Sequence, residues 1–202
     1  MAHWPTHASL HGLSARVVAR LGDAVIDVGE AAGELSVRIV REAVADALRT
    51  LRDAPDLEFE QLMDMSGVDY PERAERFEVN YHLLSLRHNW RLRVKVSTDE
   101  ETPVPTVTGV FPVAGWYERE VFDLYGVLFA GHPDLRRILT DYGFEGHPLR
   151  KDFPLSGLYE LRYSETEKRI VREPVQLRQD YRDFDFLSPW EGLLPGDEKA
   201  SP

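Results

Sequence analysis

Basic and apolar side chains alternate one by one along residues 91–96. The basic positions are Arg91, Arg93 and Lys95, and the apolar positions are Leu92, Val94 and Val96. Because successive side chains of a β-strand point to opposite faces of a sheet, this pattern predicts a strand with one apolar face and one basic face. A sheet of such strands needs cover on its apolar face, which favours a layer of helices on one side.

The remaining patterns supply the other elements of such a layered fold. Strands are predicted at residues 24–29, 34–40, 62–69, 77–86 and 90–97, the first two and the last two as hairpins. Helices are predicted at residues 14–21, 42–52 and 113–125, the last ending at Gly126. We therefore predict an α+β domain over residues 1–157: a mixed sheet with helices packed on one side, followed by an irregular Gly/Pro-rich region.

Composition removes several classes of function. The chain has 202 residues, with 24 basic and 35 acidic side chains and a net charge of −11, which disfavours a nucleic-acid partner. Cysteine is absent, so no iron–sulfur cluster can be held by thiolates of this chain. Residues 14–21 resemble part of a mitochondrial transit peptide, but Asp23 and Asp27 follow closely. With no run long enough to span a bilayer, we expect a soluble bacterial protein.

Residues 116–157 combine Gly, Pro, His, Arg and acidic residues at unusual density. The charged and histidine positions that we single out are Glu118, Arg119, Glu120, Asp123, His132, Arg136, His147, Arg150 and Asp152. Their order and spacing closely resemble the motif of the 30 kDa subunit family of NADH:quinone oxidoreductase, respiratory complex I, whose bacterial members are called the C subunit. The resemblance extends to Glu173-Pro174-Val175 and covers the C-terminal two thirds of the chain.

The resemblance implies a role within a large assembly. It implies a non-catalytic subunit that binds no cofactor and sits in the peripheral arm, chiefly against the quinone-reducing D subunit. Neighbouring subunits would carry FMN and iron–sulfur clusters, which pass electrons from NADH to quinone and couple this to proton translocation. The location implied is peripheral, on the cytoplasmic side of the bacterial inner membrane, or alternatively on the matrix side of the mitochondrial inner membrane.

Two alternatives remain beside this interpretation. The motif alone does not separate the family from a homologous subunit of a related membrane-bound hydrogenase or of another quinone oxidoreductase. The second alternative, a free-standing soluble enzyme that uses Glu118 and the histidines, is disfavoured. The sequence holds no G-x-S-x-G, H-E-x-x-H, phosphate-binding or dinucleotide-binding loop motif.

Glu118 is the most unusual position of the predicted helix at residues 113–125. On a helical wheel it falls inside the apolar arc, whereas Arg119, Glu120 and Asp123 lie on the opposite side, which we expect to be exposed. A carboxylate in an apolar arc must be paired or protonated. It is either a proton-relay acid or a structural carboxylate held by Arg136, Arg137 or Arg150, and we favour the structural role.

The histidines and arginines of the motif also have two interpretations each. His132 and His147 are either metal ligands or turn residues, each between Gly and Pro, that bond to backbone or carboxylate groups. Arg136-Arg137 and Arg150-Lys151 form either an anion site or an internal or interfacial salt-bridge network. We favour turn histidines and a salt-bridge network, and we predict no metal site.

Residues 158–202 are predicted to form an extended C-terminal arm. From Glu173 onward, charged residues mix with aromatic ones and no sustained period appears. The arm either folds back on its own domain or docks on a partner subunit, and we favour docking because interfaces are enriched in aromatic side chains. The partner-binding residues would be Tyr181, Phe184, Phe186 and Trp190.

Overall fold

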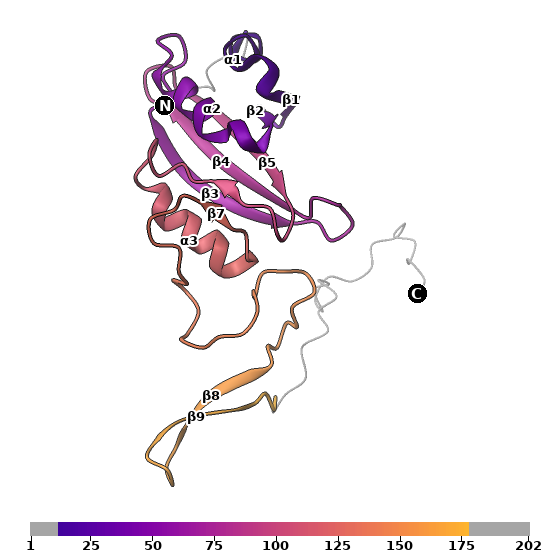
Figure 1. The fold of residues 1–202 in the computed structure, drawn as a ribbon, viewed down its shortest axis with the longest axis vertical. Coiled ribbons are helices and arrows are strands. Elements are labelled where there is room, and N and C mark those ends of the chain that lie inside the picture. Colours follow the sequence, from indigo (N-terminus) through magenta and orange to yellow (C-terminus); the bar gives the residue numbers. More distant parts are fainter. Residues whose placement is uncertain (1–11, 178–202) are drawn as a thin grey trace, which may run out of the picture. The chain divides into compact units, whose positions relative to one another are not determined.

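The computed structural model describes residues 12–177. The chain divides between Leu155 and Ser156 into two compact units. In the described residues, the first unit holds a five-stranded sheet and three α-helices, and the second holds a two-stranded hairpin (Figure 1). None of the helices described between residues 12 and 177 has the length and hydropathy to cross a bilayer.

The five-stranded sheet follows the order β1-β2-β5-β4-β3. Its strands are β1 (Val25–Ala31), β2 (Glu34–Ile39), β3 (Gln61–Asp69), β4 (Phe77–Ser85) and β5 (Trp90–Thr98). The helices are α1 (Leu13–Leu21), α2 (Val44–Asp53) and α3 (Ala114–Tyr125), with short 3₁₀ turns η1 (Gly22–Ala24) and η2 (Arg41–Ala43). Each of these strands and α-helices lies within a residue or two of its predicted bounds.

The sheet is mixed, as predicted. Strands β3, β4 and β5 form an antiparallel meander, and β1 pairs antiparallel with β2. Strand β2 joins the meander by parallel pairing with β5, where Leu35 lies opposite Leu92. The turn between β4 and β5 includes Asn89, whose φ of 52° is in the left-handed region that Asn tolerates better than most residues.

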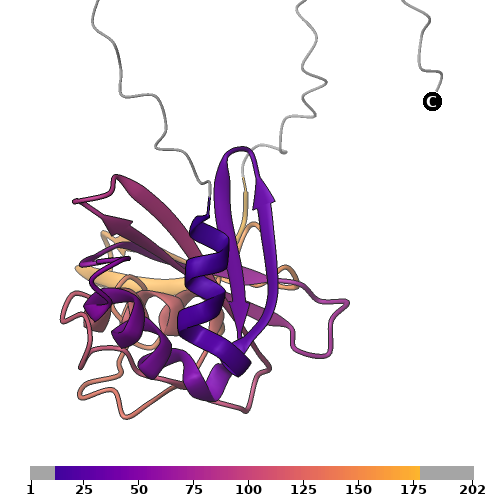
Figure 2. The same cartoon turned by 90° about the horizontal axis from the view of Figure 1, so that it is seen from above.

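All three helices cover one face of the sheet, which confirms the predicted arrangement. Leu92, Val94 and Val96 are at most 2% exposed and face the helices, while the basic positions between them face the opposite side. Helices α1 and α2 lie side by side on this face (Figures 1 and 2). Their buried positions, Leu13, Val17, Val44, Leu48 and Leu51, recur at helical spacing and complete the core.

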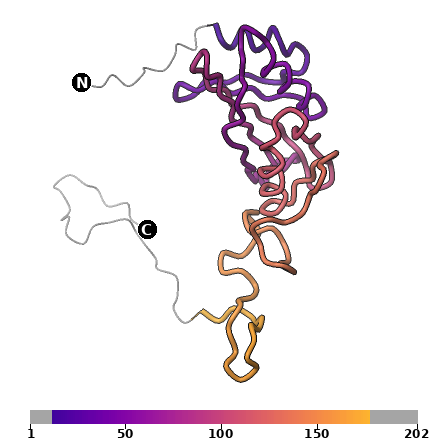
Figure 3. Tube along the Cα trace, turned by 90° about the vertical axis from the view of Figure 1, so that its left-hand side faces the viewer, coloured from indigo at the N-terminus to yellow at the C-terminus, as the bar shows by residue number. Residues whose placement is uncertain are grey.

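Two small pairings were not predicted from the sequence. Strand β6 (Val104–Pro105) pairs in parallel with β7 (Phe129–Ala130), and so joins the segments before and after α3. In the second unit, β8 (Tyr159–Ser164) and β9 (Arg169–Pro174) form an antiparallel hairpin, visible in Figure 3 as adjacent orange strands. This hairpin occupies the first part of the predicted arm. The four aromatic residues predicted to bind a partner lie outside the described residues.

Helix α3 packs directly against β3 at Gly67. A Cβ atom at this position would lie 2.6 Å from Cδ2 of the Tyr125 ring. Because a packed aromatic ring cannot yield as a flexible side chain does, only glycine allows α3 to pack at this distance. The position of α3, which carries the first half of the motif, therefore depends on the absence of a side chain on β3.

We predict that Gly67→Ala lowers the free energy of unfolding by about 1 to 3 kcal/mol, the usual range for overpacking a dense core. Gly109→Ala is the matched control, because a Cβ there meets no atom within 4 Å and its φ is not positive. Urea unfolding of both variants measures the effect. Equal stability of the two variants would show that Tyr125 yields without cost.

Candidate functional site

The C-terminal end of α3 is the point around which the motif is built. The helix ends at Gly126, whose φ of 81° reverses the chain direction and whose N–H donates to Phe122 O at 2.8 Å. A helix leaves its last four carbonyl groups without partners inside the helix. The three carbonyls that follow Phe122 must therefore find donors elsewhere.

The segment at residues 146–150 supplies these donors. Its histidine, a backbone N–H and an arginine each reach one carbonyl of the last helical turn. The pairs are His147 Nδ1 to Asp123 O at 2.9 Å, Leu149 N to Leu124 O at 3.1 Å, and Arg150 Nε to Tyr125 O at 2.6 Å. The sequence Gly-His-Pro-Leu-Arg thus acts as a C-terminal cap for α3. Burial of the His147 ring also lowers its pKa, which favours the neutral form.

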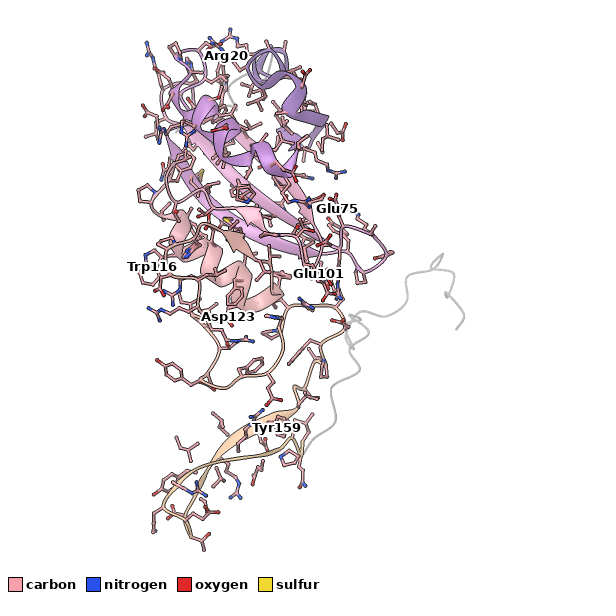
Figure 4. The ribbon with its side chains drawn as sticks, in the orientation of Figure 1. Arg20, Glu75, Glu101, Trp116, Asp123 and Tyr159 are labelled. Atoms are coloured by element: carbon pink, nitrogen blue, oxygen red, sulfur yellow. The ribbon has the colours of Figure 1, made fainter. Side chains whose placement is uncertain are left out.

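The carboxylate of Asp123 binds the loop that follows β7. Its Oδ2 accepts the consecutive backbone N–H groups of residues 138–140 at 2.7–3.0 Å, and its Oδ1 accepts the Thr140 hydroxyl at 2.6 Å. Arg137 donates to Oδ1 at 2.9 Å. Burial alone would raise the pKa of Asp123, but these hydrogen bonds outweigh it and hold the pKa far below its usual range. Figure 4 shows Asp123 on the side of α3 that faces this loop.

Arg119, one helical turn before Asp123, holds the same loop by its carbonyl groups. Its guanidinium donates to Arg136 O at 3.1 Å and to Arg137 O at 3.0 Å. Arg119 is 7% exposed and Asp123 is fully buried, so the prediction that they lie on an exposed face is wrong. The loop covers that face because its unpaired carbonyl and N–H groups find the guanidinium and the carboxylate there.

Glu118 is fully buried, but not with the partner that we expected. Its Oε2 accepts the Thr106 hydroxyl at 2.6 Å, and its Oε1 accepts the Val107 N–H at 2.7 Å. The predicted arginine partner is wrong, because Arg136, Arg137 and Arg150 pair with other acidic residues. Burial raises the pKa of Glu118, and the two hydrogen bonds reduce that shift. This carboxyl group joins α3 to the segment that follows β6.

His132 completes the link between α3 and the segment after β7. The Asp134 N–H donates to Nδ1 at 3.0 Å, which places the ring hydrogen on Nε2, where it reaches Gly115 O at 3.1 Å. Nε2 lies 3.9 Å from Glu118 Oε2. Both histidines therefore bond to backbone groups in turns, as we favoured. Within residues 12–177, no group of three or more potential metal-binding side chains is placed to hold an ion.

The last part of the motif is anchored to the end of β3. Arg76 binds Asp69 with two hydrogen bonds of 2.6 and 2.8 Å, and it also pairs with Asp152 at 3.0 Å. The Lys151 N–H donates to Asp69 Oδ2 at 2.7 Å. Hydrogen bonds from Arg76 and from this N–H lower the pKa of Asp69, although burial opposes them. The end of the motif is thus fixed to the sheet.

The motif arginines form the salt-bridge network that we favoured, with different acidic partners. Arg136 pairs with Asp134 at 2.8 Å, as expected, but Arg137 pairs with Asp123 and Arg150 pairs with Glu100 at 2.9 Å. No pattern in the sequence pointed to Thr106, Asp69, Arg76 or Glu100, which lie far from the motif along the chain. Glu120 differs from the other eight motif positions, because no described residue forms a hydrogen bond or ion pair with its carboxylate.

A sequence model of the family described as the 30 kDa subunit of the respiratory-chain NADH dehydrogenase matches residues 37–159, which include β3 to β7 and all nine motif positions. The chain belongs to this family. The resemblance found in the sequence is confirmed.

Relatives within the family are similar to this chain over nearly all of its length. Proteins named as the C subunit of NADH-quinone oxidoreductase are 65% identical in Novosphingobium aromaticivorans, 65% in Erythrobacter litoralis and 60% in Methylobacterium radiotolerans. The alignments cover 98%, 97% and 96% of this chain. The chain spans 64%, 79% and 92% of these three relatives, so the first of them is considerably longer.

A solved structure shows the same fold in another respiratory complex. A chain of the membrane-bound sulfane sulfur reductase, an archaeal respiratory membrane complex, superimposes with a TM-score of 0.61 and 26% identity. The match covers 72% of this chain and 85% of that one. The fold therefore also occurs in a complex with a different named activity.

We predict that Asp123→Asn lowers the free energy of unfolding by roughly 2 to 4 kcal/mol at pH 7, because an amide cannot accept all the hydrogen bonds that the carboxylate accepts. The folded pKa of Asp123 lies below that of the unfolded chain, which is about 3.9. Its contribution is therefore complete above that value and is lost as the pH falls through the folded pKa. The stability difference between wild type and variant should narrow in acid, as measured by urea unfolding. Asp141→Asn, at an exposed position, is the control.

The contribution of Glu118 to stability should depend on pH in the opposite direction to that of Asp123. Its raised pKa means that the folded chain binds a proton more tightly than the unfolded chain. Wild type should therefore lose stability relative to Glu118→Gln as the pH rises above about 4.3. A constant difference between wild type and Glu118→Gln from pH 4 to 8 would contradict the prediction.

Glu118→Ala should lower the free energy of unfolding by about 2 to 5 kcal/mol, because it leaves a cavity and an unpaired Val107 N–H.

Proposed function

We propose that the chain is a structural subunit of a proton-translocating NADH:quinone oxidoreductase, equivalent to the 30 kDa subunit of respiratory complex I. Family membership and the names of the relatives support this assignment. The complex would pass electrons from NADH through FMN and iron–sulfur centres to quinone, with those cofactors in neighbouring subunits. The chain itself would take no catalytic part and would lie peripherally at the cytoplasmic face of the bacterial inner membrane.

The observation that carries the structural role is the engagement of the motif. Asp123, Arg119, His147 and Arg150 all use their polar groups to hold backbone groups of α3 or of the loop. A catalytic acid, base or ligand must instead present its reactive atom to a substrate. The motif therefore supports a role in fixing an irregular surface, which we propose lies beside the quinone-reducing D subunit.

A related complex is the second candidate, because a chain of an archaeal sulfane sulfur reductase shares the fold at 26% identity. The same structural role could serve a membrane-bound hydrogenase or another quinone oxidoreductase. The partners decide between them: a flavin-bearing, NADH-oxidising subunit supports the first assignment, and a nickel-site subunit supports a hydrogenase.

The deciding experiment is affinity purification of the tagged full chain in mild detergent, with mass spectrometry of the partners. We expect the quinone-reducing subunit and an NADH-oxidising flavin subunit, together with NADH:quinone reductase activity that disappears when the chain is deleted. The chain purified alone should carry no flavin, as its visible absorption would show. Recovery of the chain without other subunits, or intrinsic catalytic activity, would refute the proposal.

The same preparation tests the predicted arm at residues 158–202. If Tyr181, Phe184, Phe186 and Trp190 bind the quinone-reducing subunit, trypsin should cleave after Arg178 or Arg182 in the isolated chain and not in the complex. The rates are compared by mass spectrometry over the same digestion times. Equal protection in both samples would show that the arm packs on its own domain.

A further inference from the structure

Strand β3 forms one edge of the five-stranded sheet, with β4 as its neighbour. In an antiparallel pair, alternate residues point their N–H and C=O groups away from the partner strand. At the start of β3 this outer edge is occupied: Tyr117 donates to Met63 O at 3.1 Å, and the Met65 N–H donates to its neighbour Asp64 at 2.8 Å. From Ser66 to Val68, no described residue outside β4 bonds to the strand backbone.

A cleft runs between this open edge and α3. It has a volume of about 150 Å³ and is lined on one side by the consecutive residues 64–67 of β3. Glu120, Val121, Leu124 and Tyr125 of α3 line the other side, together with Leu149. Because consecutive strand residues alternate between the two faces, a cleft lined by four of them reaches the backbone edge itself. We call this feature the edge cleft.

Two carboxylates without ion-pair partners stand on opposite sides of the edge cleft. Asp64 comes from β3 and Glu120 from α3, and neither forms an ion pair with any described residue. Trp116 lies one helical turn before Glu120 on the same side of α3; its side chain is 63% exposed and points outward in Figure 4. An exposed Trp is typical of a protein interface.

We propose that the edge cleft binds an extended segment of another subunit, which adds a short strand to β3 and places a Lys or Arg side chain between Asp64 and Glu120. This proposal rests on the proposed function, since it requires a multisubunit complex. It assigns a second contact surface, separate from the arm at residues 158–202. It also gives Glu120 a role that the capping network leaves open.

An extended polypeptide fits the edge cleft better than other ligands. Added strands obtain their affinity from backbone hydrogen bonds and their selectivity from pockets for alternate side chains. A second cleft, of about 330 Å³, includes Met63 and Asp64 at the start of β3 and extends over β4, β5 and β2. A second copy of this chain, paired through its own β3, would instead bring Asp64 and Glu120 toward identical carboxylates, which repel.

The absence of cysteine from the chain allows a direct test. Glu120→Cys introduces a single thiol into the edge cleft of the tagged full chain. A maleimide should modify this thiol rapidly in the free chain and at least tenfold more slowly in the purified complex, with full reactivity restored in denaturant. Equal rates in the free chain and the complex, when the subunits co-purify, would overturn the proposal and leave the proposed function intact. Failure of the wild-type chain to co-purify with other subunits would refute the proposed function itself.

A maleimide–amine crosslinker on the same thiol identifies the occupant by mass spectrometry. The expected product joins the introduced thiol to a lysine in an extended segment of another subunit. A product with residues 178–202 of this chain, or with a second copy, would overturn the proposal, as would a product within a partner helix.

Charge reversal at Glu120 tests whether the bound segment contributes a Lys or Arg side chain to the edge cleft. Glu120→Lys should lower recovery of the complex roughly tenfold at low salt, because it places like charges together, whereas Glu120→Gln should cause a smaller loss. Glu72→Lys, the same charge change at an exposed loop residue, is the matched control. Since Glu120 has no described partner, the isolated Glu120→Lys chain should keep the unfolding midpoint of wild type. Equal recovery of both Lys variants would contradict the proposal.

Discussion

The unpaired carbonyl groups at the end of α3 are the constraint on which the irregular region depends. A helix end requires donors, and a loop without secondary structure requires partners for its own N–H groups. Both requirements are satisfied between α3 and the region that follows it. Residues 147–150 donate to the last carbonyl groups of α3, and the N–H groups of residues 138–140 donate to the Asp123 carboxylate on α3. Four residues of the motif are therefore part of the backbone hydrogen-bonding scheme of this region: Arg119, Asp123, His147 and Arg150.

This arrangement orders a Gly/Pro-rich segment that has little apolar core of its own. Leu139 and Tyr142 remain exposed, while Arg119 and Arg137 hold backbone carbonyl groups between residues 136 and 150. Ordering a loop before it meets a partner removes part of the entropy cost of association. A surface that is fixed in this way suits the proposed subunit role, because its apolar side chains are presented in one arrangement.

The sheet and helices were predicted well from the sequence because their signals are local. Alternation at residues 91–96 and the glycine at Gly126 each report on their own neighbourhood. The partners of Glu118 and the burial of Asp123 were missed, since a helical wheel shows which face is apolar but not which loop will cover a polar face. The pairing of β6 with β7 was missed because a strand of two residues is too short to show a periodic pattern in the sequence. The resemblance to the family indicated what periodicity could not, namely that the charged and histidine residues between positions 118 and 152 form one motif.

The parallel pairing of β2 with β5 has a consequence for how the chain folds. Strands β3, β4 and β5 are joined by short loops and pair with their sequence neighbours, whereas β2 reaches β5 only after α2, β3 and β4 have intervened along the chain. Closing so long a loop is slow and gains no contact until it is complete. We therefore expect the meander to form first and to serve as the template on which the N-terminal hairpin and α1 assemble. During synthesis, β1 and β2 emerge from the ribosome first but cannot join the sheet until β5 is complete at residue 98. The N-terminal edge of the sheet therefore forms only after most of the domain has been synthesised.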